Sequence, residues 1–386
     1  MDEIKEKLSY ICSQFRIEGE ILVYRWIPSG HINTAYYAAV YDGKEIYQLL
    51  IQRINTYVFR DPVGMMRNIE RITEHIRSQE PTMEKRRRLH FRHTAERKNY
   101  VALKDGVVAN EKEVDFQDPS VEFWRVYNFI EFSTSFETAE GNPEVLRMSG
   151  VAFGKFLRLL KDFDAGSLME SIPHFHDTRF RLNAFFQAVD EDVMGRVKEA
   201  QEEIEIIREN RDFAETLCRA IDNGELPIRV THNDTKTNNI LFDKDTLDPL
   251  VVIDLDTCMP GLACYDFGDT IRFAACTAEE DQPDGMSLDL DLMRAYTKGY
   301  LEEVRDVLTE AEIQSLPIGA AVITLELASR FLLDYLVGDK YFRIDYPEQN
   351  LRRAQAQLVL FQDMMKHMDD MQKIVQELSA SSKEQV

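Results

Sequence analysis

The chain has 386 residues, which is enough for two domains of ordinary size or one large two-part domain. Its apolar content of 44% can supply a hydrophobic core and excludes a disordered chain. Asp and Glu number 68 against 46 Lys and Arg, so the formal net charge of −22 repels a phosphate backbone and nucleic acid is not an expected partner. A small anionic ligand stays compatible, because a few local cations and a metal ion can hold one inside an acidic protein.

No uninterrupted apolar stretch reaches about 18 residues, so no membrane span is expected. The charged opening sequence MDEIKEKLSY contains no apolar signal core. The five cysteines are scattered and form no Cys-x-x-Cys pair, which indicates reduced thiols and excludes a disulfide framework or a zinc site. We therefore expect a cytoplasmic protein. We also expect it to be a monomer.

Strands and turns alternate at the start of the chain. Three strands are predicted over Ile21–Trp26, Ala35–Val40 and Glu45–Ile54. The turn Pro28–Thr34 separates the first two strands, and an Asp-Gly turn separates the second and third. This pattern predicts a small antiparallel sheet.

A helix is predicted after these strands, because Asp61 can cap it and Pro62 suits its first turn. Apolar residues then recur every three or four positions and give the helix one buried face. Two further strands, around Tyr100–Leu103 and Phe123–Ile130, are expected to complete the sheet.

The pattern becomes helical from about residue 131. Amphipathic stretches predict helices over Pro143–Lys161, Glu191–Ile221, Leu288–Leu308, Glu310–Tyr335 and Gln349–Leu378. One short β-rich insert, Arg229–Asp256, interrupts them. We therefore expect an α+β protein with two lobes. Residues 1–130 form a small antiparallel-sheet N-terminal lobe, residues 131–386 form a larger, mainly helical C-terminal lobe, and ligands prefer clefts between such units.

The β-rich insert contains the pattern His-x-Asp-x-x-x-x-Asn at His232, Asp234 and Asn239, and the hairpin that follows ends at Asp254. Phosphoryl transfer needs a positioned acceptor hydroxyl and cations on the developing charge. Asp234 can accept the proton of that hydroxyl, and Lys236 can place positive charge on the transferred group. Asn239 and Asp254 offer the oxygen ligands that Mg²⁺ prefers, and a hairpin between them would bring them together. The insert is thus a candidate phosphoryl-transfer site.

Other interpretations of this segment stay open. The whole pattern could be a surface turn rich in Asn, Asp and Thr that leads into an ordinary hairpin. We expect His232 to support the loop through backbone hydrogen bonds. Asp256 could touch the metal or cap the turn that follows it.

Over nearly its whole length, and in order, the sequence resembles the N-acetylhexosamine 1-kinases of the aminoglycoside phosphotransferase and choline kinase group, whose fold is that of the protein kinases. The segments that carry the resemblance are SGHINT (29–34), LIQRIN (50–55), WRVYNFI (124–130), HNDTKTNN (232–239), IDLDTCMPG (253–261), DFGDTIR (266–272) and RFLLDYL (330–336). The resemblance implies a bilobal protein-kinase-like fold. It also implies transfer of the γ-phosphoryl of ATP, with Mg²⁺, to the anomeric hydroxyl of N-acetylglucosamine or N-acetylgalactosamine.

The resemblance further implies that the Pro28–Thr34 turn lies over the nucleotide phosphates and that the backbone of Tyr127–Ile130 holds the adenine. The expected nucleotide-binding residues are Gly30, Ile32, Asn33, Thr34, Arg53, Tyr127 and Phe129. Arg53 is the cation nearest to the position where protein kinases carry a lysine on the third strand, and an arginine can bind phosphate bidentately. Its ion-pair partner would be Glu70 or Glu74. The alternative for Arg53 is an exposed strand residue.

The expected contacts to the sugar acceptor are His31, Asp269, Arg330, Asp334 and Tyr335. The last three share one helical face inside an otherwise apolar helix, which indicates either a cleft wall or a structural ion pair. His31 could equally pack its own loop. Asp269 could equally pair with a helix-surface arginine one turn further along.

Two histidines close together in a loop, His174 and His176, lack a third metal ligand and are interpreted as surface residues. The acceptor could also be another small alcohol, such as an aminoglycoside, choline or methylthioribose. A non-catalytic nucleotide or sugar sensor is the alternative of a different class. The presence of Asp234, Asn239 and Asp254 argues against that sensor.

Overall fold

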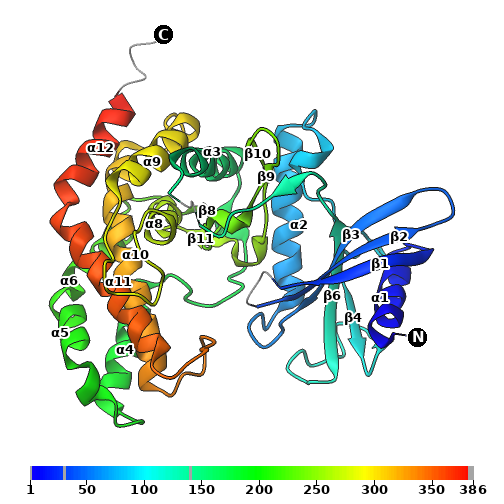
Figure 1. Ribbon diagram of the computed structural model, residues 1–386, viewed down its shortest axis with the longest axis horizontal. Coiled ribbons are helices and arrows are strands. Elements are labelled where there is room, and N and C mark those ends of the chain that lie inside the picture. The colour runs from blue at the N-terminus through cyan, green and yellow to red at the C-terminus, as the bar shows by residue number, and fades with distance from the viewer. Residues whose placement is uncertain (1, 29–31, 139–140, 381–386) are drawn as a thin grey trace. The chain divides into compact units, whose positions relative to one another are not determined.

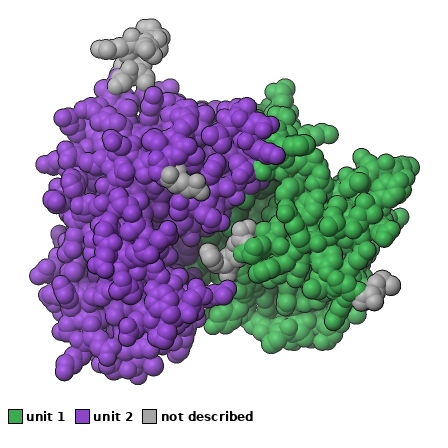
Figure 2. All heavy atoms as spheres, viewed as in Figure 1, with its two compact units in different colours: residues 1–133, 169–173, 253–258 green, residues 134–168, 174–252, 259–386 purple. Residues whose placement is uncertain are grey.

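The computed structural model describes residues 2–28, 32–138 and 141–380. The chain forms two compact units, shown in different colours in Figure 2. The first unit contains residues 1–133, 169–173 and 253–258, and the second contains residues 134–168, 174–252 and 259–386. Two short segments from later in the chain thus belong to the N-terminal unit.

The first unit is built on a six-stranded sheet with the order β1-β2-β3-β6-β4-β5, and all its strand pairs are antiparallel (Figure 1). Its strands are β1 (Glu20–Ile27), β2 (Thr34–Tyr41), β3 (Ile46–Ile54), β4 (Val101–Lys104), β5 (Val107–Val108) and β6 (Val121–Asn128). The predicted antiparallel N-terminal sheet is confirmed.

The two faces of β3 have different surroundings. Leu49 and Ile51 belong to a buried core that includes residues of helix α1 (Glu3–Gln14). Successive residues of a strand point to opposite faces of a sheet. Arg53 therefore lies on the α1 face, whereas Gln52 lies on the opposite face.

Helix α2 (Pro62–Gln79) begins where the sequence predicts. The carboxylate of Asp61 accepts a backbone N–H of the first turn at 2.8 Å, and Pro62 stands at a position where a missing N–H costs nothing. Met66 of α2 lies with its sulfur 3.7 Å from Nη1 of Arg125 on β6. Because the neighbours of Arg125 in β6, Trp124 and Val126, belong to the α1 core, α2 packs against the face opposite to α1.

The second unit is mainly helical. Its helices are α3 (Pro143–Leu159), α4 (Thr178–Glu191), α5 (Gln201–Glu209), α6 (Arg211–Ala214), α7 (Thr216–Asp222), α8 (Ala263–Ala274), α9 (Leu290–Val304), α10 (Glu310–Leu336), α11 (Gln349–Lys366) and α12 (Met368–Ala380). The α+β class is confirmed. The single helix predicted over Glu191–Ile221 is wrong, because Asp192 adopts a φ of 40° after α4 and Gly195 one of 68°. The predicted helix Gln349–Leu378 is divided at His367.

Helices α8 and α10 pack closely because both present a glycine at their contact. A Cβ on Gly268 would lie 2.6 Å from the Cα of Ala320, and one on Gly319 would lie 2.4 Å from the carbonyl oxygen of Cys264. Both distances are too short for any side chain, so only glycine permits this approach. The contact fixes the position of α8, which carries two of the acidic residues discussed below.

Helix α10 forms the core of the second unit. By length and composition it could cross a membrane, but 83% of its most apolar window is buried inside the protein. A buried core helix has this combination of properties, so α10 gives no support for a membrane span.

Short strands hold the segment with the Asp-to-Asn motif. Strand β8 (Arg229–Thr231) pairs with β11 (Met259–Gly261), and β9 (Ile240–Asp243) pairs with β10 (Pro249–Val252), both antiparallel. Strand β7 (Ser133–Thr134) lies where the first segment of the first unit ends. The hairpin predicted after Asn239 is confirmed.

Candidate active site

The loop between β8 and β9 is held by two buried carboxylates of α8. The N–H groups of His232 and Asn233 donate to the two oxygens of Asp266 at 2.7 and 2.8 Å, and the N–H of Thr235 donates to Asp269 at 2.9 Å. Asn233 adopts a φ of 63°, an uncommon conformation for a residue other than glycine. These bonds fix the loop backbone in its strained shape.

The pKa values of the two buried α8 carboxylates are shifted in opposite directions. Burial raises the pKa of Asp266 to about 6, although the nearby His232 and the two backbone N–H groups act in the opposite direction. Burial also disfavours the charge of Asp269, but Arg272, which donates to it at 2.7 Å, keeps the pKa of Asp269 below its ordinary value. Asp269, predicted as a sugar contact, instead supports the loop and pairs with Arg272.

Three of the predicted chemical side chains lie together at the exposed side of this loop. Asn239 donates through Nδ2 to the Oδ2 and the carbonyl oxygen of Asp234, at 2.9 and 2.8 Å. Lys236 places Nζ 3.6 Å from Oδ1 of Asp234 and 5.2 Å from the centre of the Phe273 ring. The carboxylate of Asp234 raises the pKa of Lys236. The side chain of Asp234 is 33% exposed, so it can meet a ligand.

His232 supports the loop, as predicted. Its side chain is fully buried against the rings of Phe153 and Phe156, and its Nδ1 accepts the N–H of Asp234 at 3.3 Å. This role leaves the imidazole inside the loop rather than facing a ligand.

His176 is a supporting residue that the sequence analysis placed on the surface, and that prediction is wrong. Its side chain is 12% exposed, its Nδ1 lies 2.9 Å from the buried Glu326, and its Nε2 lies 3.4 Å from the carbonyl oxygen of Asn233. His174 is half exposed, in agreement with the prediction. No local pattern in the sequence links His176 to Glu326, because 150 positions separate them.

Asp254 precedes a short 3₁₀ helix, Leu255–Thr257, and adopts a φ of 59°. In the β9–β10 hairpin, Val252 lies opposite Ile240. The chain therefore enters β9 and leaves β10 at the same end of the hairpin.

Asp256 neither caps a turn nor faces solvent. It is 2% exposed and forms a two-point ion pair with Arg125, which is 3% exposed. Asn33 also donates to Asp256 at 2.7 Å through Nδ2. This ion pair is neither of the two roles expected for Asp256, which were a contact to the metal and a cap of the following turn. The sequence analysis did not select Arg125, because its partner lies 131 positions away in the sequence.

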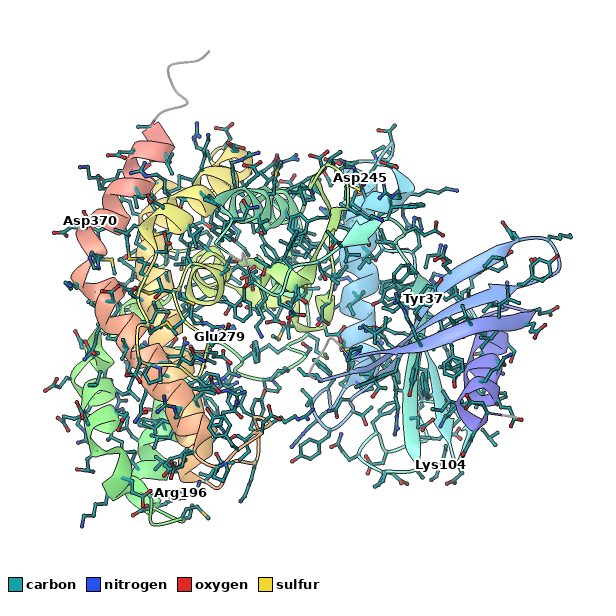
Figure 3. All side chains as sticks on the ribbon, viewed as in Figure 1. Tyr37, Lys104, Arg196, Asp245, Glu279 and Asp370 are labelled. Carbon is teal, nitrogen blue, oxygen red and sulfur yellow. The ribbon has the colours of Figure 1, made fainter. Side chains whose placement is uncertain are left out.

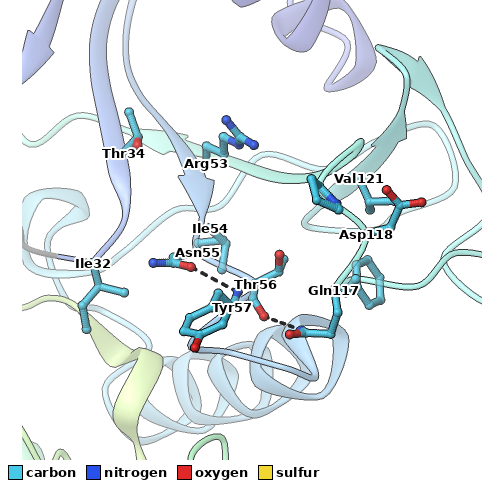
Figure 4. A pocket seen from close by; sticks show the side chains of 12 residues that line it. Ile32, Thr34, Arg53, Ile54, Asn55, Thr56, Tyr57, Gln117, Asp118 and Val121 are labelled. Carbon is cyan, nitrogen blue, oxygen red and sulfur yellow. Dashed lines mark hydrogen bonds between the residues drawn. The ribbon is translucent and has the colours of Figure 1, made fainter. Parts of the chain in front are cut away.

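The structure does not support the expected position of Arg53. This side chain is 44% exposed on the α1 face, 3.5 Å from Glu122. Within the described residues neither proposed helix partner forms an ion pair with it, since Glu70 lies 3.7 Å from His93 and Glu74 pairs with Arg77. Arg53 lines a cavity of about 360 Å³ with residues from the ends of β2 and β3 and the loop before β6 (Figure 4).

Among the predicted phosphate-turn residues, Gly30 and His31 lie outside the described residues. Asn33 uses its side chain within the protein, because its Oδ1 accepts the N–H of Asn55 at 2.9 Å while its Nδ2 binds Asp256. Ile32 is exposed and, with Thr34 at the start of β2, lines the cavity of Figure 4.

The predicted adenine-binding segment has two of its donors occupied. The N–H of Phe129 donates to the carbonyl oxygen of Gln48, and that of Asn128 to the carbonyl oxygen of His90, both at 2.9 Å. The Phe129 ring contacts Tyr37, which is labelled in Figure 3. Tyr127 packs its ring against Phe91.

The three residues predicted to share one face of α10 have different surroundings: Asp334 and Tyr335 are buried, and Arg330 is partly exposed. Asp334, 1% exposed, accepts three backbone N–H groups of residues 340–342 and the amide of Asn350. The hydroxyl of the buried Tyr335 donates to Glu199 at 2.7 Å. These two side chains therefore form hydrogen bonds within the protein and stabilise the fold. Arg330 lies over the rings of Phe175 and Phe342.

A second cavity, of about 470 Å³, lies in the helical unit beside Arg272 and Phe273. Its wall includes the loop between α8 and α9, where Glu279 is labelled in Figure 3, and Gln357 of α11. Phe273, which lines this cavity, also contacts Lys236 of the loop that carries Asp234.

Within residues 2–28, 32–138 and 141–380, no group of three or more His, Cys, Asp or Glu side chains is arranged to hold a metal ion. None of the five cysteines, all of which lie in the described residues, forms a disulfide bond. A tightly enclosed protein metal site is thus not found in the described part of the chain. A Mg²⁺ ion that keeps waters and binds substrate phosphates needs only one or two protein oxygens.

A model of the phosphotransferase enzyme family matches residues 27–306 of this chain. Among solved structures, a choline kinase from Cryptosporidium parvum Iowa II has a TM-score of 0.54 at 14% identity, over 95% of this chain and 96% of that chain. A spectinomycin phosphotransferase, APH(9)-Ia, solved with ADP and spectinomycin, has a TM-score of 0.52 at 14% identity, over 98% of each chain. An ethanolamine kinase from Plasmodium vivax has a TM-score of 0.50 at 15% identity, over 87% and 82%.

These structural likenesses confirm the predicted protein-kinase-like fold class. The family match covers well over half of the chain and includes the Asp-to-Asn motif, its hairpin and Asp254. The chain therefore belongs to the phosphotransferase enzyme family.

Proposed function

We propose that this protein transfers the γ-phosphoryl group of Mg-ATP to the anomeric hydroxyl of an N-acetylhexosamine. The observation that carries the proposal is the arrangement of Asp234. Asn239 fixes one of its oxygens, Lys236 lies beside the other, and the carboxylates of α8 hold the loop beneath them. Asp234 then accepts the proton of the acceptor hydroxyl at Oδ1, and Lys236 stays protonated and offers charge to the transferred group.

The residues present suit Mg²⁺. The side-chain Nδ2 of Asn239 donates to Asp234. Within the described residues the side-chain oxygen of Asn239, Oδ1, accepts no hydrogen bond, so this oxygen is available as a ligand. We propose this oxygen and the carboxylate of Asp254 as the ligands, because hard oxygen donors are what Mg²⁺ prefers. Bound Mg²⁺ would neutralise the charge that develops on the nucleotide phosphates.

For the nucleotide, we propose the turn that ends at Thr34, with Ile32 at its edge, and the end of β6 at Tyr127. Arg53, Asn33 and Phe129 are left out, because the first pairs with Glu122 at 3.5 Å and the other two already use the groups in question within the protein.

The cavity beside Phe273 is our proposed acceptor site. Arg272, Gln357 and the hydroxyl of Thr138 line it together with apolar groups, a mixture that suits a polyhydroxylated molecule with an acetamido group. Gln357 is only 2% exposed, and in the described part of the chain its Nε2 has no hydrogen-bond acceptor. It can therefore donate to a ligand oxygen. Arg330 remains a second proposed contact to the acceptor.

The carboxylates of the same cavity bear on two of the alternative acceptors, the aminoglycosides, which carry amines, and choline, which carries a quaternary ammonium. Glu280 lies 3.4 Å from Arg272 and 3.6 Å from Arg353, and Asp289 caps α9. Glu279 is exposed and could attract a cation. An aminoglycoside or choline is thus the second candidate class of acceptor.

A coupled assay of ADP release tests the proposal with ATP, Mg²⁺ and a panel of N-acetylglucosamine, N-acetylgalactosamine, choline, methylthioribose and an aminoglycoside. We expect turnover on the N-acetylhexosamines and the sugar 1-phosphate as product. Asp234→Asn serves as the control for contaminating kinases. Turnover on choline or the aminoglycoside alone contradicts the favoured acceptor, and no turnover on any compound while ADP binds supports the sensor.

A further inference from the structure

The first unit carries a buried cation on the sheet face opposite to Arg53. Arg125 of β6 lies opposite Gln52 of β3 in the strand register, and its Nε donates to Oε1 of Gln52 at 2.8 Å. The guanidinium is 3% exposed. A buried guanidinium is stable only when it is paired and hydrogen-bonded, so its partners define what it does.

The partner of Arg125 is Asp256, which comes from far along the chain. The two groups meet through both guanidinium ends, with Nη1 2.5 Å from Oδ1 and Nη2 3.2 Å from Oδ2. This two-point geometry fixes orientation as well as distance, unlike the point charge of a lysine. The sheet thereby holds one particular residue of the turn Asp254–Asp256.

Two further hydrogen bonds hold the same turn within the first unit. Asn33 donates to Oδ2 of Asp256 at 2.7 Å, and the hydroxyl of Ser171 donates to its carbonyl oxygen at 2.7 Å. Asn33 is itself fixed by the N–H of Asn55. The Asp254–Asp256 turn is therefore tied to β6, to the residue before β2 and to the segment 169–173.

The backbone of Asp254 explains why so many contacts are needed. Its φ of 59° and ψ of 55° lie in the left-handed region, which residues other than glycine occupy rarely. Such a conformation persists only where surrounding contacts hold it. The network around Asp256, two residues further along, supplies those contacts.

We propose that the Arg125–Asp256 ion pair is a positioning device that holds Asp254 in the orientation required for binding Mg-nucleotide. The inference rests on the proposed function, because that function gives Asp254 its role as a metal ligand. Arg125 and Asp256 act through Asp254 and do not touch the reacting atoms.

Stability and positioning can be separated for this pair. Removing one member of a buried ion pair leaves an unpaired charge and is strongly destabilising, whereas replacing both with neutral residues is often neutral. The single variants Arg125→Met and Asp256→Asn should therefore lower the melting temperature more than the double variant does. If the pair had only a structural role, the double variant would have both the wild-type melting temperature and the wild-type gain in ADP affinity from Mg²⁺.

The experiment measures ADP affinity by titration calorimetry, with MgCl₂ and with EDTA, together with the melting temperature. In the wild type we expect Mg²⁺ to strengthen ADP binding. In Arg125→Met/Asp256→Asn we expect a melting temperature close to wild type, but a gain in affinity from Mg²⁺ that falls by about tenfold or more. Arg53→Met is the matched control, because it removes an arginine from the other face of the same sheet.

A double variant that keeps the full gain from Mg²⁺ overturns the proposal. If that variant does not fold, Arg125→Lys decides the question, since it keeps the charge but loses the two-point geometry. A folded Arg125→Lys with wild-type Mg²⁺ dependence also overturns the proposal, and a reduced dependence supports it. A wild type that binds no ADP at all contradicts the proposed function instead, so the two failures are distinguishable.

Discussion

The loop around Asp234 and the turn around Asp256 hold their carboxylates in opposite ways. Asp234 is one-third exposed, and an amide and an ammonium group beside it leave it accessible to a ligand. Asp256 is almost completely buried, and Arg125, Asn33 and the sheet surround it. The partly exposed carboxylate of Asp234 can therefore meet a ligand, whereas the buried carboxylate of Asp256 is engaged in contacts within the protein. We therefore expect the loop around Asp234 to take part in the chemistry and the turn around Asp256 to position other groups.

The largest effect should come from Asp234→Asn, which removes the proton acceptor while keeping the side-chain volume. We expect turnover to fall by about 10³-fold, in the range of lost general-base catalysis. ADP affinity should not change, because Asp234 is proposed to contact the acceptor. Initial rates and calorimetry on the same preparation check both statements. Activity within about tenfold of wild type would show that Asp234 is not the base.

Asp269→Asn tests the support beneath the loop. The change leaves the guanidinium of Arg272, which is 4% exposed, without its closest carboxylate. Loss of one partner from a buried pair costs about 3–5 kcal/mol of unfolding free energy. Urea denaturation measures this loss. Asp245→Asn, in the exposed turn labelled in Figure 3, is the control and should be neutral.

The pH dependence of stability tests Asp266. Because burial raises the pKa of Asp266 to about 6 from 3.8, the folded state holds a proton that the unfolded state releases. The contribution of this carboxyl group is therefore most favourable below about pH 4 and falls by about 3 kcal/mol as the pH rises through 6.

The variant Asp266→Asn lacks this titration, so its melting temperature relative to wild type should rise between pH 4 and 7. Thermal denaturation across that range is the measurement. A difference that stays constant with pH shows that the pKa of Asp266 is not raised.

Gln357→Leu tests whether the acceptor binds in the cavity beside Phe273. The change keeps the approximate size of the side chain and removes the amide donor from the cavity wall, so the KM for the acceptor should rise about fivefold to tenfold. The KM for ATP should stay the same. Gln314→Leu, on the exposed side of α10, is the control. Equal effects of both variants on the acceptor KM would remove this cavity as the acceptor site.

Arg53→Met should have the smallest effect. The ion pair with Glu122, at 3.5 Å and largely in solvent on the Arg53 side, contributes less than about 1 kcal/mol to stability. ADP affinity should not change, because Arg53 pairs with Glu122 and is not among the proposed nucleotide contacts. A tenfold loss of affinity would restore Arg53 as a phosphate contact and blur the distinction between the two sheet faces.

The sequence by itself determined the features that depend on neighbouring residues. The capped start of α2, the β1–β3 meander and the hairpin after Asn239 follow from local turn and helix chemistry. The spacing from Asp234 to Asn239 likewise fits a loop in which one side chain bonds the other directly.

Only the tertiary structure decided which charges are buried and paired. Whether β3 presents Arg53 or Gln52 to a given face depends on how the whole sheet packs against α1 and α2, and no local pattern reports it. The ion pair of Arg125 and Asp256 joins positions 131 residues apart, and His176 meets Glu326 across 150. Such pairs are selected by burial, where an unpaired charge is costly, and burial exists only once the chain has folded.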